Sequence, residues 1–241
     1  MERYYLFMLL ALLAEIVGTV SGFGSSILFV PLASLFFDFK TVLGVTAIFH
    51  VFSNVSKIVL FREGINKNIA LRLGIPAILF VVLGAWLTSF IPVKPLEAIM
   101  AVALIGLAIY LLRNFDRPLQ QTNANLYAGG AASGFLAGLT GTGGAIRGIT
   151  LAAFQLPKSI FIATSALIDL GVDSSRAIIY VSNGYFQRRN LVLIPLLILV
   201  SLVGSYLGKL ILNYTSEKAF RYIVVVVVMA VSVFQVIRLL V

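Results

Sequence analysis

The chain has 241 residues, of which 60% are hydrophobic and only 11% are charged, and its mean hydropathy is +1.05. Soluble domains carry about 25% charged residues, so the composition excludes an ordinary soluble protein and predicts an all-α, polytopic membrane protein. The absence of cysteine and the single histidine exclude disulfides, thiol catalysis and a multi-histidine metal site. We expect no metal, no cofactor and no catalytic residue. The net charge of +9 lies mainly between apolar runs, which favours membrane topology over nucleic acid binding as its cause.

Taken in chain order, six segments reach the length of about 20 mostly apolar residues that a membrane span needs. They are residues 42–62, 69–91, 96–112, 160–181, 190–212 and 219–240. Two pairs of shorter apolar pieces, 4–20 with 24–37 and 126–139 with 143–156, each meet at a glycine-rich sequence. We expect each pair to be a helix broken by irregular backbone, which gives about eight membrane segments. The polar stretch 113–125 has no apolar face, and it links a first membrane unit, 1–118, to a second, 119–241.

The second half of the chain repeats the first at an offset of about 119 residues. The first glycine-rich hinge, Ser21-Gly22-Phe23-Gly24-Ser25-Ser26, aligns with the second, Thr140-Gly141-Thr142-Gly143-Gly144-Ala145. On the helices that follow, Thr46, His50, Asn54, Lys57 and Phe61 align with Ser165, Asp169, Asp173, Arg176 and Tyr180. Internal duplication around interrupted apolar segments is typical of membrane transporters.

The two hinges are the candidate binding site. Glycine lets the backbone adopt positive φ and approach a ligand, and non-helical backbone at membrane depth persists only where protein buries it or where it lines a polar cavity. The helix after each hinge points its free N–H groups and positive dipole end at that cavity, which suits an anion. We predict substrate contacts from Ser21, Gly22, Gly24, Ser25, Ser26, Thr140, Gly141, Thr142, Gly143 and Gly144. The alternative is that these glycines only permit close helix packing.

The aligned polar residues after the hinges are spaced by 4, 4, 3 and 4 positions in both halves, so each set shares one helical face. A charge near the bilayer centre costs about 2.5–3.5 kcal/mol on insertion scales, so these faces must contact protein or water. We predict that Arg147, Lys57 and Arg176 are charge partners of an anion and that His50, Asp169 and Asp173 couple transport to protons.

Bland alternatives stay open for the same residues. Lys57 and Arg176 could extend to the lipid head groups, His50 could be a neutral packing residue, and the two aspartates could form a structural ion pair with Arg176. Glu15, isolated in an apolar segment, could equally pair with a cation or line the cavity.

Both hinges lie in a wider pattern. Gly22-Phe23-Gly24-Ser25-Ser26 with Pro31-Leu32, and Gly138 with Gly141-Thr142-Gly143-Gly144, are each followed by a hydroxyl-bearing helix, Val45-Thr46-Ala47 and Ala163-Thr164-Ser165-Ala166. In these features, over essentially its whole length, the sequence resembles the sulfite exporter TauE/SafE family of membrane permeases. The resemblance implies about eight membrane segments, two glycine-rich repeats, and transport of small anions such as sulfite, sulfoacetate and related organosulfur or organic acids. The chain departs from the family pattern at Ser25, Ser26, Ala145 and Thr150, and in placing Arg147 just beyond the second hinge.

These features predict a permease that moves a small anion across the cytoplasmic membrane with proton coupling. A membrane chaperone or assembly factor would explain the apolar bulk but gives no reason for two polar hinges. An intramembrane serine protease could use Ser133, but the only histidine, His50, precedes it, whereas in rhomboid proteases the base follows the serine. We therefore expect a non-enzyme, for which a homo-oligomer is compatible with the sequence.

Short loops rich in Lys and Arg stay on the cytoplasmic side. This rule places there the loop with Arg62, Lys67 and Arg72, its counterpart with Arg188 and Arg189, and the linker with Arg113 and Arg117. If each hinged pair makes one net crossing, both termini join that side and the two halves are parallel repeats. If each pair crosses twice, the second repeat is inverted.

Overall fold

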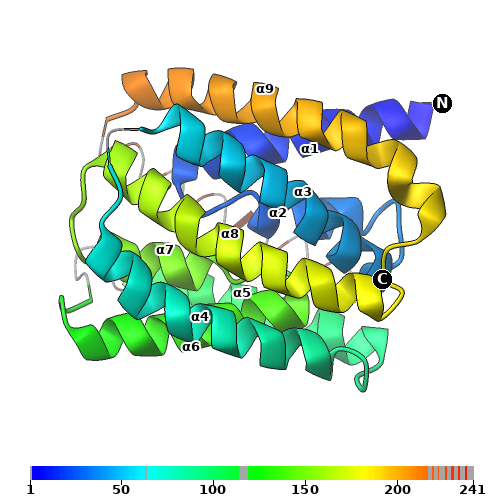
Figure 1. The fold of residues 1–241 in the computed structure, drawn as a ribbon, viewed down its shortest axis with the longest axis horizontal. Helices are drawn as coiled ribbons and strands as arrows, with labels where there is room; N and C mark the ends of the chain where they lie inside the picture. The colour runs from blue at the N-terminus through cyan, green and yellow to red at the C-terminus, as the bar shows by residue number, and fades with distance from the viewer. Residues whose placement is uncertain are drawn as a thin grey trace.

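The computed structural model describes residues 2–62, 64–113 and 119–216 and, beyond them, residues 219, 222, 226, 229, 230, 233 and 237. All the elements within this part of the chain are helical, so the all-α prediction is confirmed (Figure 1). The helices are α1 (Glu2–Ser21), α2 (Ser26–Ala33), α3 (Phe39–Leu60), α4 (Lys67–Leu87), α5 (Val93–Arg113), α6 (Asn123–Thr140), α7 (Gly144–Ala152), α8 (Lys158–Ser182) and α9 (Leu193–Tyr214), the last preceded by a 3-10 turn, η1 (Arg188–Val192). The linker prediction, 113–125, falls partly on residues 114–118, which lie outside the described residues.

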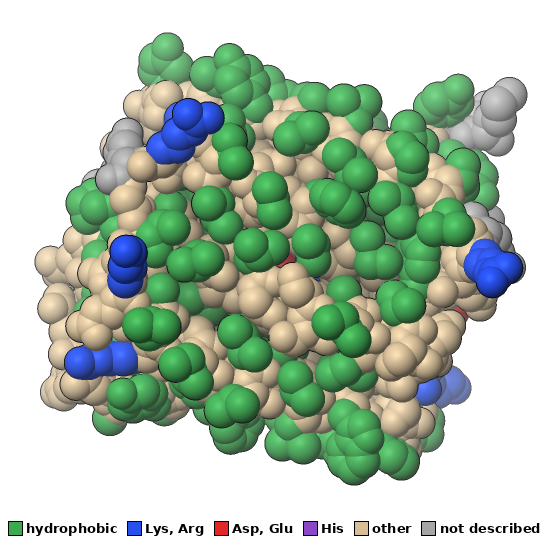
Figure 2. Space-filling model, viewed as in Figure 1, with side chains coloured by type: hydrophobic (Ala, Val, Ile, Leu, Met, Phe, Trp, Pro, Cys, Tyr) green, Lys and Arg blue, Asp and Glu red, His purple; other side chains and the backbone are tan. Residues whose placement is uncertain are grey.

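Five of the described helices are long and apolar enough to cross a membrane, and the prediction of a multi-pass membrane protein is confirmed. They cover Tyr4–Ser21, Phe39–Leu60, Lys67–Leu87, Val93–Tyr110 and Asn190–Tyr214. The predicted span 160–181 lies in α8, which is long enough but carries Asp169, Asp173 and Arg176. The predicted span 219–240 lies largely outside the described residues. Apolar side chains cover the face shown in Figure 2, and Lys and Arg gather at its two ends, as a bilayer requires.

One set of helices, α1, α3 and α9, runs side by side in one direction (Figure 1). Glu15 of α1 accepts hydrogen bonds from Ser53 of α3 at 2.6 Å and Ser205 of α9 at 2.9 Å. Closer to the C-terminal ends of α3 and α9, Lys209 of α9 donates to the carbonyl of Leu60 of α3 at 2.6 Å. These hydrogen bonds join α1, just before the first hinge, to α3 and α9, and they join α9 to the end of α3.

The helices α4, α6 and α8 form the second set. Gly134 and Gly138 of α6 pack on the backbone of Ala77 and Val81 of α4, so these two helices run parallel. A Cβ on Gly134 would lie only 2.0 Å from the Ala77 carbonyl oxygen. Glycine therefore allows the two backbones to touch, which is a packing device common in membrane helices.

The two sets meet where α3 packs antiparallel against α8. The side-chain amide of Asn54 donates to Asp173 at 2.7 Å, and the backbone N–H of Asn66, the N-cap of α4 in the loop that follows α3, donates to Thr164 near the start of α8 at 3.0 Å. Along this contact the residue numbers rise on the α3 side while they fall on α8. The C-terminal end of α3 therefore lies beside the N-terminal end of α8.

Both hinged pairs turn back on themselves. The ring of Phe7, early in α1, lies 5.8 Å from that of Phe29 in α2 and 5.2 Å from that of Phe37 just after it. In the second pair, Gly129 of α6 lies against the side chain of Thr150 in α7. Each pair is therefore a helical hairpin, in which the second helix returns toward the end of the molecule where the first helix begins.

These directions correct the predicted topology. Because α3 and α8 are antiparallel, the basic loops at 62–72 and 188–189 lie at opposite ends, so the prediction that they share one side is wrong. Because the first hairpin returns to its starting end, α1 begins at the end opposite loop 62–72, and the two cannot both be cytoplasmic. One net crossing per hinged pair, and the parallel repeats that depended on it, are also wrong. Apolar length alone does not distinguish a helix that continues after a hinge from one that reverses.

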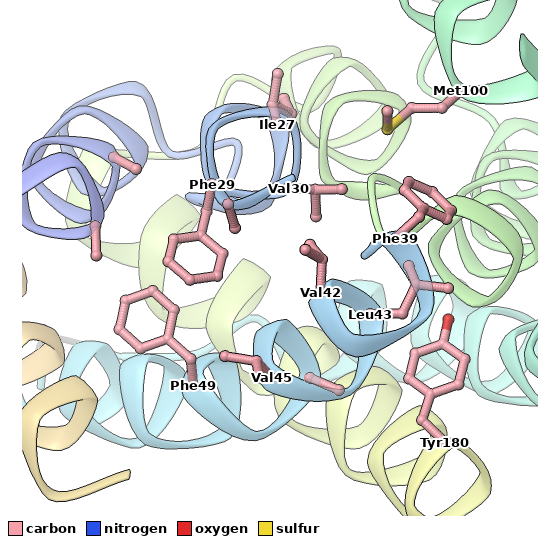
Figure 3. Close-up of a cluster of buried hydrophobic side chains, with 14 of the residues drawn as sticks. Ile27, Phe29, Val30, Phe39, Val42, Leu43, Val45, Phe49, Met100 and Tyr180 are labelled. Carbon is pink, nitrogen blue, oxygen red and sulfur yellow. The ribbon is translucent and has the colours of Figure 1, made fainter. Parts of the chain in front are cut away.

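An apolar cluster fixes the first hairpin in place. Phe29 and Val30 of α2 point at α3, where Val42, Leu43 and Phe49 meet them (Figure 3). The rings of Phe29 and Phe49 lie 4.8 Å apart and both residues are buried. Van der Waals contact of this kind stabilises helix packing within a membrane, so the hinge that precedes α2 is held against the middle of α3.

Candidate functional site

A polar cavity lies where the two hinges meet, between α3 and α8. It is lined by Gly24, Ser25, Ser26, His50, Ser53, Asn54, Lys57, Ala137, Gly141, Gly143, Gly144, Arg147, Asp169, Val172, Asp173 and Arg176. The structure thus brings both hinges and both polar helix faces to one place. Four predicted residues, Ser21, Gly22, Thr140 and Thr142, are buried in the hinges beside it without lining it.

The hinges use glycine for two different reasons. Gly24 has φ +85° and Gly141 has φ +80°, a left-handed conformation that side chains with a Cβ rarely adopt. Gly143 has φ −82°, so its conformation needs no glycine, but a Cβ there would lie 1.9 Å from the Ser133 carbonyl oxygen. Gly24 and Gly141 are therefore required by the backbone conformation of the two hinges, whereas at Gly143 the packing alternative has direct support.

Glu15 is the centre of a buried polar cluster behind the first hinge. It is 0% exposed and its Oε1 lies 2.8 Å from the ammonium of Lys57. Ser25 donates to Oε2 at 2.6 Å, while Ser53 and Ser205 donate to Oε1 at 2.6 and 2.9 Å. Lys57 is thus held inside the protein and does not extend to the surface. The sequence left the role of Glu15 open, although an isolated acid in an apolar helix is itself a sign of function or pairing.

The other two cations of the cavity are also paired. Arg147, just after the second hinge, forms an ion pair with Asp169 and donates from Nε to Ser165 at 2.9 Å. Arg176 lies 2.7 Å from Asp173. Buried charges need such partners because an unpaired charge in a low-dielectric interior is costly.

His50 bridges the two polar helix faces. Its Nε2 lies 3.0 Å from the hydroxyl of Ser25, and its Nδ1 lies 3.3 Å from a guanidinium nitrogen of Arg176. A guanidinium can only donate, so Nδ1 accepts and carries no proton. Nε2–H then donates to Ser25, whose own proton goes to Glu15. His50 is therefore neutral in this conformation, and it can bind a second proton only after Arg176 moves away.

The formal charges of the site sum to zero. Three cations, Lys57, Arg147 and Arg176, each face one carboxylate at a salt-bridge distance. Three cations in one membrane-embedded cavity can bind an anion, but every one of them already has an anionic partner. An incoming anion must therefore compete with a carboxylate of the protein.

The described residues do not assemble a metal site or the protease alternative. No group of three or more His, Cys, Asp or Glu side chains among them could hold a metal ion. The hydroxyl of Ser133 donates to the Gly130 carbonyl at 3.1 Å, while His50 bonds to Ser25 and Arg176. The only histidine of the chain thus has other partners than the serine that the protease interpretation needs.

Comparisons with known proteins show which proteins the chain resembles. The family described as "Sulfite exporter TauE/SafE" matches residues 7–234 of the chain. A probable membrane transporter protein of Methanocaldococcus jannaschii is 27% identical over 225 residues, which are 85% of this chain and 84% of the relative. No solved structure shows a significant match.

Proposed function

The chain belongs to the sulfite exporter TauE/SafE family, and we propose that it is a permease for a small sulfonate-like or organic anion that binds between the two hinges. Its family and its similarity to a probable membrane transporter support membrane transport as the general function. The observation that carries the proposed substrate class is the convergence of Lys57, Arg147 and Arg176 on one buried cavity beside the N-terminal ends of α2 and α7. Cationic side chains and free backbone N–H groups are the ligands that anions prefer.

The two halves act as inverted repeats related by a two-fold axis through the cavity. Asn54 and Asp173, which the repeat alignment makes equivalent, hydrogen-bond to each other across 119 positions. A residue touches its own counterpart only near a two-fold axis, and the antiparallel contact of α3 with α8 puts that axis in the membrane plane. Inverted repeats with a central site and broken helices are typical of transporters that expose the site to the two sides in turn.

The end of the molecule that carries loop 62–72 faces the cytoplasm. Six of the described cations lie at or near that end, Arg62, Lys67, Arg72, Arg113, Lys158 and Lys209, and five lie at the opposite end, Arg3, Lys40, Lys94, Arg188 and Arg189. The charge rule favours the more basic end as cytoplasmic. The N-terminus is then on the outer side, which reverses the expectation from the sequence.

Transport is coupled to protons because the site is already neutral. An anion that enters adds a charge to a membrane-embedded cavity, where each uncompensated charge costs about 2.5–3.5 kcal/mol or more. A proton that binds with the anion cancels this charge. Asp169, Asp173 and His50 line the cavity and can bind protons.

The test is flux through purified protein in liposomes, with sulfite, sulfoacetate, methanesulfonate and acetate offered in turn. We expect saturable entry of at least one of these anions above that in empty liposomes. Arg147→Gln should lose this flux, and Arg62→Gln, which removes an exposed arginine outside the cavity, should keep it. If none of the four anions enters, or if both variants transport equally, the proposed function is wrong.

A further inference from the structure

We propose that the carboxylate of Asp169 occupies the place on Arg147 that the anionic group of the substrate takes during transport, so that Asp169 binds a proton when the anion displaces it. This inference rests on the proposed function and identifies which cation binds the anion and which acid binds the proton.

Arg147 is in contact with both hinges. Its guanidinium contacts Asp169 and lies 3.5 Å from the Phe23 carbonyl of the first hinge. A Cβ on Gly24 would lie 3.5 Å from the same guanidinium and 3.7 Å from Asp169, and a Cβ on Gly144 would lie 3.2 Å from the guanidinium. The Arg147–Asp169 pair thus sits between the two hinges, which is where the proposed function has the anion bind.

Asp169 is the least firmly held of the three carboxylates. In the described part of the chain its only hydrogen-bond partner is Arg147. Asp173 is held by both Arg176 and Asn54, and Glu15 by Lys57 and several hydroxyls. The side chain of Asp169 is 14% exposed, against 6% for Asp173 and 0% for Glu15. An anion that displaces Asp169 therefore breaks the contact of that carboxylate with one partner, Arg147. Displacement of either of the other two carboxylates would break contacts with more partners.

Displacement makes protonation of Asp169 favourable. Apart from Arg147 on α7, the charged and titratable groups that line the cavity are Lys57 and His50 on α3 and Asp173 and Arg176 on α8 itself. Glu15 on α1 lies behind them, paired with Lys57. Lys57 and Arg176 keep their own carboxylates, and His50 is neutral, so none of them compensates a free Asp169. An unpaired buried carboxylate beside a second one is costly, and a proton removes that cost.

The alternative is that Arg147 and Asp169 form a fixed structural pair. An anion would then bind elsewhere in the cavity, and its affinity would not depend on the ionisation of Asp169. The two possibilities differ in how anion binding depends on pH.

The experiment measures binding of methanesulfonate and of sulfoacetate to the purified full chain by calorimetry between about pH 5.5 and about pH 8.0, where the sulfonate group stays ionised. We expect the wild-type affinity to rise about tenfold for each unit by which the pH falls, over the range where one proton binds with one anion. Asp169→Asn should bind the anion more tightly than wild type at the upper end of the range and with no pH dependence. Asp38→Asn is the matched control, because Asp38 caps α3 outside the cavity and asparagine caps as well; it should keep the wild-type slope.

Wild-type affinity that is independent of pH overturns the inference, as does an Asp169→Asn variant with the wild-type slope. If the variant does not fold, calorimetry of wild type in buffers with different ionisation enthalpies counts the protons taken up per anion. One proton supports the inference and none overturns it. Wild type that binds neither sulfonate, and transports none of the four anions, refutes the proposed function instead.

Discussion

Substitution of Glu15 by glutamine tests whether Lys57 is locked inside the protein. The change keeps the side-chain volume but removes the negative charge, so Lys57, whose side chain is 6% exposed, is left with uncharged acceptors only, the hydroxyl of Ser53 at 2.7 Å and the amide oxygen of the glutamine. Removal of one partner from a buried ion pair costs about 3–5 kcal/mol. For a chain of this length 1 kcal/mol shifts the melting temperature by about 2–4 °C, so we expect Glu15→Gln to lower it by about 6–20 °C.

The assay is thermal unfolding of the purified protein in one detergent, followed by circular dichroism. Adding Lys57→Met to Glu15→Gln removes the second charge while keeping most of the apolar stem, and it should recover most of the loss, because a pair replaced by uncharged side chains leaves no buried charge. A decrease of less than about 2 °C for Glu15→Gln alone would mean that Lys57 reaches the head groups, and the buried cluster would then not stabilise the hinge.

Three further changes address the hinge, the topology and the coupling. Gly24→Val should abolish anion flux in protein that still inserts, because valine is strained at φ +85° by about 1–3 kcal/mol; normal flux would leave this hinge as a packing feature. Cysteines at Lys67 and Arg188, both exposed, should react with an impermeant maleimide from opposite sides of the membrane, and labelling of both from one side would refute the antiparallel arrangement. His50→Gln should reduce the response of flux to an imposed pH gradient less than Asp169→Asn does, because His50 is already neutral; a larger effect of His50→Gln would reverse the assignment.

The sequence was sufficient to predict the helical class, both helix breaks and the polar faces of α3 and α8. These features depend on local properties: apolar length, glycine between apolar pieces, and spacing on one helix. The alignment at an offset of about 119 also pairs Asn54 with Asp173, which hydrogen-bond in the structure, because an equivalence between two halves is visible in the order of residues alone.

The direction of the chain after each hinge could not be predicted in this way. Whether α2 continues from α1 or turns back depends on tertiary contacts such as Phe7 with Phe37, and no local pattern specifies them. The same limit applies to Glu15, because its partners Ser53 and Ser205 lie 38 and 190 positions away. The sides of the basic loops were predicted from the charge rule, which is statistical, and the antiparallel packing of α3 against α8 places two of these loops at opposite ends.

The most direct test of an anion and a proton moving together is the lumenal pH of liposomes that contain the purified chain and a trapped pH-sensitive dye. An inward gradient of methanesulfonate, a monoanion, with no pH gradient imposed, should acidify the lumen of wild-type liposomes, and Arg147→Gln should abolish the change while Arg62→Gln leaves it intact. Entry of methanesulfonate into wild-type liposomes without any acidification would contradict the account.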